Sequence, residues 1–257
     1  MNDLQRIYGD AEAFHAQWAP LLEAAGRRLV EGLPSDARRI LDLGAGTGAN
    51  VPGIARVAPS ARIVAADFVE PMVRRVPPPA NRVVMDASRL GFSHETFDGV
   101  LMAFMLFHVP DHAAALAEVR RCLRPGGTLA VGTWAAADPG DFAANQIWTR
   151  ELDAHGAAVP PPSIMQHELM DTAAKLTGLL LAAGFEDVAS ETQDFEDPTT
   201  PEVFLERRTK LGCSYLRFDS LDAAAQRAML ERVREQFARL TPSDFVSRER
   251  AIYAWAR

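Results

Sequence analysis

The 257-residue chain contains only two cysteines, Cys122 and Cys213, which lie far apart in the sequence. Two scattered thiols exclude a disulfide framework and a thiolate-based metal site. No apolar run approaches the roughly 18 to 20 residues that cross a bilayer, and the first residues lack the charged-then-apolar order of a signal peptide. These absences predict a cytoplasmic protein with no membrane partner.

The chain also carries fewer positive than negative side chains, with 27 lysines and arginines and 34 aspartates and glutamates. Neutralising nucleic-acid phosphates needs a surplus of lysine and arginine on one surface, so we expect no nucleic-acid partner. The hydrophobic share of 48% is enough for one large core. The composition therefore predicts a single globular domain over residues 1–257.

From Arg38 onward, short segments rich in leucine or β-branched residues alternate with amphipathic segments. This alternation predicts an α/β domain whose sheet is mostly parallel and covered on both faces. The expected strands are residues 38–43, 61–67, 81–87, 97–104, 126–134, 186–195 and 248–257. The expected helices lie within residues 10–32, 47–58, 70–76, 111–123 and 172–185.

Three segments outside this alternation are expected to be helical. Residues 1–35 precede the first strand, and Pro20 fits the start of a second helix there. Residues 138–170 hold one expected helix and a proline-rich turn, whereas residues 199–240 hold two or three more helices. Insertions at these two places are expected to lie together over one end of the sheet.

A glycine-rich turn follows the first expected strand in "RRILDLGAGTGAN", residues 38–50. Gly44, Gly46 and Gly48 carry no side chain, so a nucleotide-like ligand can lie against backbone amides at the start of the next helix. The segment "GAGTGA" also satisfies the pattern of a dinucleotide-binding enzyme. The turn alone therefore leaves an NAD-dependent oxidoreductase open.

Acidic residues close the first three expected strands. Asp42 ends the first strand, and Asp67 ends the second, where a carboxylate can accept hydrogen bonds from ribose hydroxyls. Asp86 closes the third strand in "VVMDASRLGF". The later segments "FDGVLMAF" and "LRPGGTLAV" complete a set that a dehydrogenase does not need.

In order and spacing these motifs resemble the class I S-adenosylmethionine-dependent methyltransferases, within them the small-molecule group related to quinone, sterol and natural-product methyltransferases. The resemblance covers residues 38–134, the implied cofactor-binding core, and extends loosely to 176–185 and 251–257. It implies a Rossmann-like sheet of seven strands, mostly parallel with the last strand antiparallel, under helical lid insertions. It also implies S-adenosylmethionine as cofactor, S-adenosylhomocysteine as product, and methyl transfer to a small organic molecule.

The same resemblance implies a cofactor site. Asp42 would help to orient the ammonium group, Asp67 would bind the ribose, and Asp86 would accept a hydrogen bond from the adenine amine. Further implied contacts are Gly44, Ala45, Gly46 and Gly48 under the methionine part, Phe68 and Met72 beside adenine, the amide of Ala87, and Ala103 and Phe104 facing the methionine group. Ala45 replaces a cysteine common in relatives, which we expect to be harmless.

Methyl transfer needs a general base only where the acceptor enters protonated. His108 is the candidate catalytic residue, because it follows the fourth strand and histidine titrates in the useful range. The alternative is a loop histidine that packs against or caps the next helix. Residues expected near the acceptor are Tyr8, Phe14, Trp18, His108, Phe142, Trp148, His155, His167 and Phe204.

Helical spacing leaves core packing as the alternative for these aromatic residues. If they line a cavity, the acceptor is apolar or aromatic. An acidic acceptor would require a paired arginine, which the sequence pattern does not locate. No metal site is expected, since no His/Asp/Glu pair has helical ligand spacing beside carboxylates left free of the cofactor.

Two further functions remain possible besides the oxidoreductase. A protein with this site could bind S-adenosylmethionine without catalysis. Transfer to an RNA base is a third possibility, against which stand the acidic balance and "AFMLFHVP" where an "NPPY"-like stretch would be expected. A monomer or a homodimer fits the sequence equally well.

Overall fold

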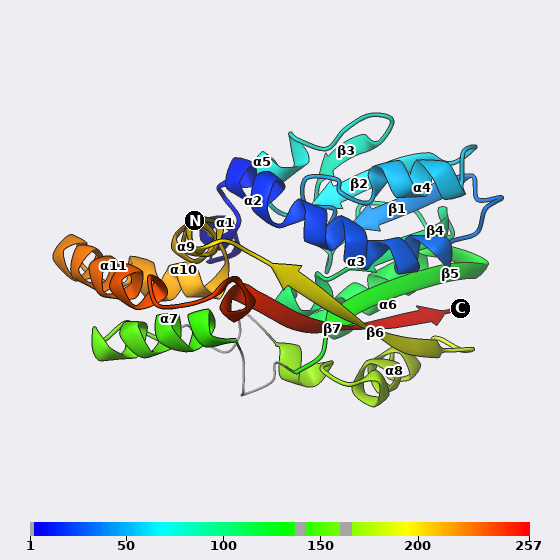
Figure 1. The fold of residues 1–257 in the computed structure, drawn as a ribbon. Coiled ribbons are helices and arrows are strands. Elements are labelled where there is room, and N and C mark those ends of the chain that lie inside the picture. The colour runs from blue at the N-terminus through cyan, green and yellow to red at the C-terminus, as the bar shows by residue number, and fades with distance from the viewer. Residues whose placement is uncertain (1–2, 137–141, 160–165) are drawn as a thin grey trace.

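Within residues 3–136, 142–159 and 166–257, which the computed structural model describes, seven strands form one sheet in the order β3-β2-β1-β4-β5-β7-β6 (Figure 1). β7 pairs antiparallel with both β5 and β6, and the other pairs are parallel. The expected fold class is confirmed. The strands are β1 Arg39–Leu43, β2 Arg62–Asp67, β3 Asn81–Val84, β4 Phe97–Ala103, β5 Leu123–Trp134, β6 Ala189–Pro198 and β7 Val246–Ala256.

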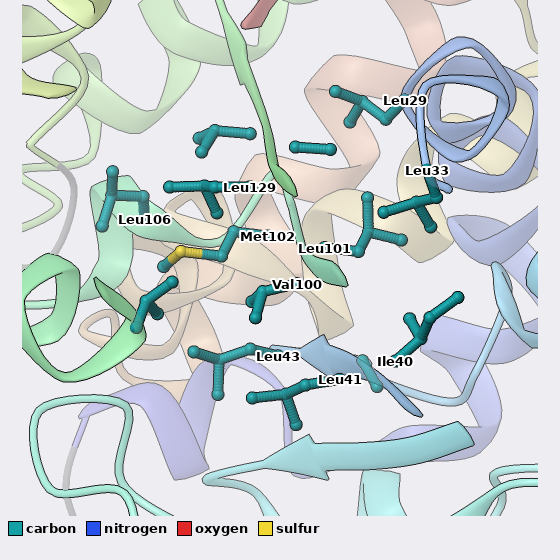
Figure 2. Close-up of a cluster of buried hydrophobic side chains, with 14 of the residues drawn as sticks. Leu29, Leu33, Ile40, Leu41, Leu43, Val100, Leu101, Met102, Leu106 and Leu129 are labelled. Carbon is teal, nitrogen blue, oxygen red and sulfur yellow. The ribbon is translucent and has the colours of Figure 1, made fainter. Parts of the chain in front are cut away.

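The central strands β1, β4 and β5 are almost wholly buried, as a parallel sheet covered on both faces requires. In Figure 2 the leucines of these strands belong to one cluster with Leu29 of the N-terminal helix α3 (Ala19–Glu31) and with Leu33, which follows that helix. Each fully buried leucine contributes about 1.5–3 kcal/mol relative to an exposed one. This core holds the carboxyl ends of the strands in fixed relative positions.

Helices cover the sheet largely where the sequence predicts them. The break before Pro20 is confirmed, since α2 ends at Gln17 and α3 begins at Ala19 with Pro20 in its first turn. β3, however, ends at Val84 rather than Ala87, because Asp86 bends the chain by accepting the amide of Ser88. The helices are α1 Asp3–Ile7, α2 Ala11–Gln17, α4 Val51–Val57, α5 Glu70–Val73, α6 His112–Cys122 and α8 Ala173–Ala182.

Four more helices form a lid at one end of the sheet, close to α1 (Figure 1). They are α7 Ala143–Ala154, α9 Pro201–Lys210, α10 Gly212–Asp219 and α11 Ala223–Phe237. Trp148 of α7 and Phe204 of α9 share one buried hydrophobic cluster with residues of α10 and α11, so the two insertions pack together as expected. Residues 137–141 and 160–165, which include parts of the first expected insertion, lie outside the described residues. None of the described helices is both long enough and apolar enough to span a bilayer.

Candidate functional site

The turn between β1 and α4 requires glycine at two positions for steric reasons. Gly44 and Gly48 have φ angles of 73° and 82°, which side chains with a Cβ rarely adopt. A Cβ on Gly44 would lie 2.5 Å from Met105 Cγ, and one on Gly48 would lie 2.6 Å from Pro77 Cδ. Without these side chains the backbone of the turn comes close to whatever occupies the end of the sheet.

Asp67, at the end of β2, is tied to this turn. Its Oδ2 accepts the amide of Gly46 at 2.8 Å, and its Oδ1 accepts the amide of Val69 at 2.9 Å. Burial raises the pKa of the Asp67 carboxyl, whereas the backbone amides that it accepts oppose the rise. Since a carboxylate has about four lone-pair sites, room remains for two ribose hydroxyls.

Asp42, in β1, is buried without a partner. Its side chain is 1% exposed, and neither carboxyl oxygen has a hydrogen-bond partner among the described residues. Burial, together with the negative charge of Asp67, raises the pKa of Asp42 to about 7. A buried carboxyl without a donor is costly, so the site fits a ligand that brings a cationic group.

A cavity of about 690 Å³ opens beside the turn and extends below the lid. Asp42, Ala45 and Gly48 are buried and do not line this cavity. The other positions implied for the cofactor do line it: Gly44, Gly46, Asp67, Phe68, Met72, Asp86, Ala87, Ala103 and Phe104.

The aromatic and acidic positions of this part of the wall suit an adenosine. Phe68 is 38% exposed, which is unusual for so large an apolar side chain, while Met72 is buried. Asp86 is exposed at the rim. An apolar face and a carboxylate are therefore available for the ring and the amine of adenine.

Most residues expected near the acceptor line the same cavity. Trp148 and His155 do not. Trp148 is fully buried in the lid cluster, where its Nε1 donates to Ser214 Oγ at 3.0 Å. The Nδ1 of His155 lies 2.8 Å from the backbone oxygen of Glu151 at the end of α7. The residues that do line the cavity are Tyr8, Phe14, Trp18, His108, Phe142, His167 and Phe204.

Tyr8 and His108 form a polar pair in the wall of this cavity. The Tyr8 hydroxyl oxygen and His108 Nε2 are 2.8 Å apart, and the rings meet edge to face. Burial raises the pKa of Tyr8, so its hydroxyl stays protonated. His108 lies in the short 3-10 helix Leu106–His108, which follows β4. The pair thus brings a titratable imidazole to the end of β4.

Helix α2 also contacts the glycine-rich turn, which the sequence did not indicate. His15 Nδ1 lies 3.1 Å from Thr47 Oγ1, and Gly46 faces the ring of Phe14. Only the docking of α2 against the turn, 32 residues along the chain, brings His15 and Thr47 together. No local pattern could have identified this contact.

Several other wall residues escaped the sequence analysis. Trp134 ends β5 and stacks on Phe104 with 4.2 Å between ring centres, so its position at a strand end was a usable signal. Phe107 stacks on His167 at 3.7 Å, and burial lowers the pKa of His167 to about 4, which keeps this imidazole neutral. Arg207 and Arg208 reach the wall from the lid helix α9, although their positions after Glu202 and Glu206 favour a solvated helix face. In the described part of the chain, no group of three His, Cys, Asp or Glu side chains is arranged to hold a metal ion.

Part of the chain that builds this site is similar to known proteins. The family described as "Methyltransferase domain" matches residues 41–131. The chain is 45% identical over 98 residues to a demethylmenaquinone methyltransferase of Mycobacterium sp. (strain KMS), a match that covers 36% of this chain and 40% of the relative. A demethylmenaquinone methyltransferase of Thermus thermophilus is 39% identical over 113 residues, covering 41% and 51%. The chain thus spans about half the length, or less, of these relatives.

Solved structures extend the similarity to nearly the whole chain, at the level of the fold. Phosphoethanolamine N-methyltransferase 2 of Haemonchus contortus, solved with S-adenosyl-L-methionine, has a TM-score of 0.58 and 15% identity over 99% of this chain and 58% of its own. An S-adenosylmethionine-dependent methyltransferase from Archaeoglobus fulgidus has a TM-score of 0.53 and 18% identity, covering 93% and 94%.

Proposed function

We propose that this chain, whose residues 41–131 match the family described as "Methyltransferase domain", transfers the methyl group of S-adenosylmethionine to a small organic molecule. The observation that carries the proposal is one continuous cavity, with Asp67 and Asp86 in one part of its wall and Tyr8 and His108 in another. A donor and an acceptor could therefore lie next to each other in one cavity.

The cofactor would be held by residues of β1 to β4. Asp67 would bind the ribose hydroxyls, and Asp86 with Phe68 would receive the adenine. Asp42, buried and without a donor, would compensate the charge of the ammonium group from behind the glycine-rich turn. When bound, the cofactor supplies a sulfonium methyl group that is open to attack by a nucleophile.

The protein would contribute mainly by positioning and by excluding water. Attacking atom, methyl carbon and sulfur must lie nearly in line, which a closed cavity between sheet and lid favours. Aromatic faces such as Phe104 and Trp134, stacked in the wall, stabilise a dispersing positive charge better than water-filled space does.

His108 would act as general base for an acceptor that enters protonated. His108 Nε2 is hydrogen-bonded to the Tyr8 hydroxyl, so the acceptor's proton would travel through that hydroxyl. The Tyr8 hydroxyl would give its own proton to the imidazole of His108 and take the proton of the acceptor in its place. Tyr8 would also hold the imidazole toward the cavity.

The acceptor would be apolar or aromatic in its body, because phenylalanine and tryptophan side chains make up much of the wall below the lid. The relatives named as demethylmenaquinone methyltransferases support a small-molecule acceptor rather than a nucleic acid. The acidic composition of the chain supports the same choice.

Calorimetric titration with S-adenosylmethionine, S-adenosylhomocysteine and NADH tests the proposal. We expect both sulfur compounds to bind and NADH not to bind. Incubation of metabolite pools with methyl-labelled cofactor, followed by mass spectrometry, would then identify the labelled product. Binding of NADH alone would support the oxidoreductase instead, and cofactor binding without any labelled product would support a non-catalytic binding protein.

A further inference from the structure

The cavity has a second polar region on the lid side. Asp197 at the end of β6, Arg207 of α9, and Ser247 and Glu249 at the start of β7 all contribute to the wall there. In the sheet, β6 is three strands away from β4, whose end carries His108, and strands are spaced roughly 4.8 Å apart. Asp197 therefore lies about 14 Å across the sheet from the end of β4.

Some hydrogen-bonding groups of this region have partners, and one does not. The carboxylate of Asp197 accepts from Arg207 Nη1, and the carboxylate of Glu249 accepts from Ser247 Oγ. Arg207 Nε, in contrast, is buried and has no hydrogen-bond partner among the described residues. A buried donor without an acceptor is costly, so the group that this region lacks is an acceptor.

The geometry of the arginines favours an anionic acceptor. The Arg207 side chain is 17% exposed and pairs with Asp197, whose side chain is 16% exposed, so the guanidinium is held in one direction. Arg208 follows on the same helix and also lines the cavity, with its guanidinium carbon 5.1 Å from the centre of the Phe204 ring. A guanidinium edge presents two parallel N–H donors, which match the two oxygens of a carboxylate.

We propose that the methyl acceptor carries a carboxylate at the end remote from the methylated atom, and that Arg207 binds this carboxylate through its Nε edge. The acceptor is then an aromatic acid with its apolar body below the lid. This inference rests on the proposed methyl transfer. It identifies Arg207 as an arginine that could pair with an acidic acceptor, which the sequence pattern did not locate.

The test uses 6-hydroxy-2-naphthoate, its methyl ester and 2-naphthol as probes, titrated calorimetrically into protein saturated with S-adenosylhomocysteine. We expect the wild-type protein to bind the acid about tenfold more tightly than the ester or the naphthol, as a charge-assisted pair implies. Equal affinity for acid and ester, or no binding of the acid, would overturn the proposal.

Variants test whether Arg207 causes the preference for the acid over the ester. Arg207→Gln should abolish it, and Arg207→Lys, which keeps a charge beside Asp197 but has no Nε edge, should lose most of it. The double change Asp197→Asn with Arg207→Gln avoids an unpaired buried carboxylate if the single variant fails to fold. Arg248→Gln, an exposed arginine paired with Glu196, is the matched control and should keep the full preference.

A preference that survives in Arg207→Gln would also contradict the proposal. Failure of the proposed function gives a different result, because it would appear as wild-type protein that does not bind S-adenosylhomocysteine in the first titration. The affinity for S-adenosylhomocysteine should be unchanged in all three Arg207 variants.

Discussion

At the scale of single residues, the candidate site is built from carboxyl groups in unlike surroundings. Asp67 accepts two backbone amides, whereas Asp42 is buried with neither oxygen satisfied by a described residue. We propose that the first binds neutral hydroxyls and that the second balances a positive charge. The difference makes the two residues separately testable.

Asp67→Ala should weaken binding of S-adenosylmethionine by about 1–3 kcal/mol, because two ribose hydroxyls and two backbone amides lose their acceptor. Isothermal titration calorimetry measures the loss. Asp111→Ala is the matched control, since Asp111 only caps α6. It should cost about 1 kcal/mol of stability and leave cofactor affinity unchanged. Unaltered affinity in Asp67→Ala would refute the ribose assignment.

Asp42→Asn should stabilise the protein in a pH-dependent way. The folded-state pKa of Asp42 is about 7, against an ordinary 3.8, so the folded protein binds its proton more tightly than the unfolded chain does. The resulting penalty is absent below about pH 4, grows as pH rises toward 7, and is constant above. Denaturant unfolding at pH 8 should therefore show a gain of about 2–4 kcal/mol that shrinks as pH falls.

Asp98→Asn should change the free energy of unfolding in the opposite direction to Asp42→Asn. The backbone amides of Arg38 and Arg39 and the guanidinium of Arg124 hold the pKa of Asp98 below its usual range despite its partial burial. Its contribution is present above the unfolded pKa and lost as pH falls, so this variant should lose stability at pH 8. A pH-independent effect in Asp42→Asn would contradict the buried, partnerless state.

His108→Gln should lower kcat by about 10²- to 10⁴-fold for an acceptor that must lose a proton, while the affinity for S-adenosylhomocysteine stays the same. Tyr8→Phe should act in the same direction, because the proton path runs through its hydroxyl. Steady-state kinetics with the acceptor found by mass spectrometry provides the measurement. His112→Gln is the control, since His112 does not line the cavity. Wild-type kcat in His108→Gln would remove the base from the mechanism.

At the scale of elements, the turn between β1 and α4 links core packing to the site. Gly48→Ala should destabilise the fold by about 1–3 kcal/mol, because φ is 82° and the added Cβ would meet Pro77. Gly178→Ala is the matched control: it lies inside α8, and its Cβ would meet nothing within 4 Å, so it should be neutral or slightly stabilising. Thermal unfolding compares the two, and equal effects would show that the turn is not under steric constraint.

At the scale of the whole molecule, the cavity is lined by the carboxyl ends of strands, by the N-terminal helices and by the lid helices. α1 and α2 bridge these parts, through an ion pair of 2.8 Å between Arg6 and Asp219 of α10 and a hydrogen bond of 2.8 Å between Gln17 and Glu206 of α9. Closure of the site thus depends on contacts between segments from opposite ends of the chain.

A substitution in the lid should lower the free energy of unfolding without changing the affinity of the candidate cofactor site. Trp148→Phe removes buried area and the hydrogen bond to Ser214, so it should cost about 1–3 kcal/mol of unfolding free energy. Because Trp148 does not line the cavity, the affinity for S-adenosylhomocysteine should be retained. Denaturant unfolding and calorimetry on the same samples measure both, and a parallel loss of affinity would mean that the lid organises the cofactor site.

The amino-acid sequence alone determined the strand and helix order, the glycine-rich turn with its acids, and the resemblance to methyltransferases, because these depend on local periodicity and short spacings. Folding decided what no local pattern encodes. Tyr8 contacts His108, which is 100 residues away in the sequence. Arg207 lines the same cavity as Leu4, near the N-terminus. Trp148 packs in the hydrophobic cluster of the lid. Such contacts arise only when separate hydrophobic clusters dock, since docking, not sequence neighbourhood, sets which side chains share a buried space.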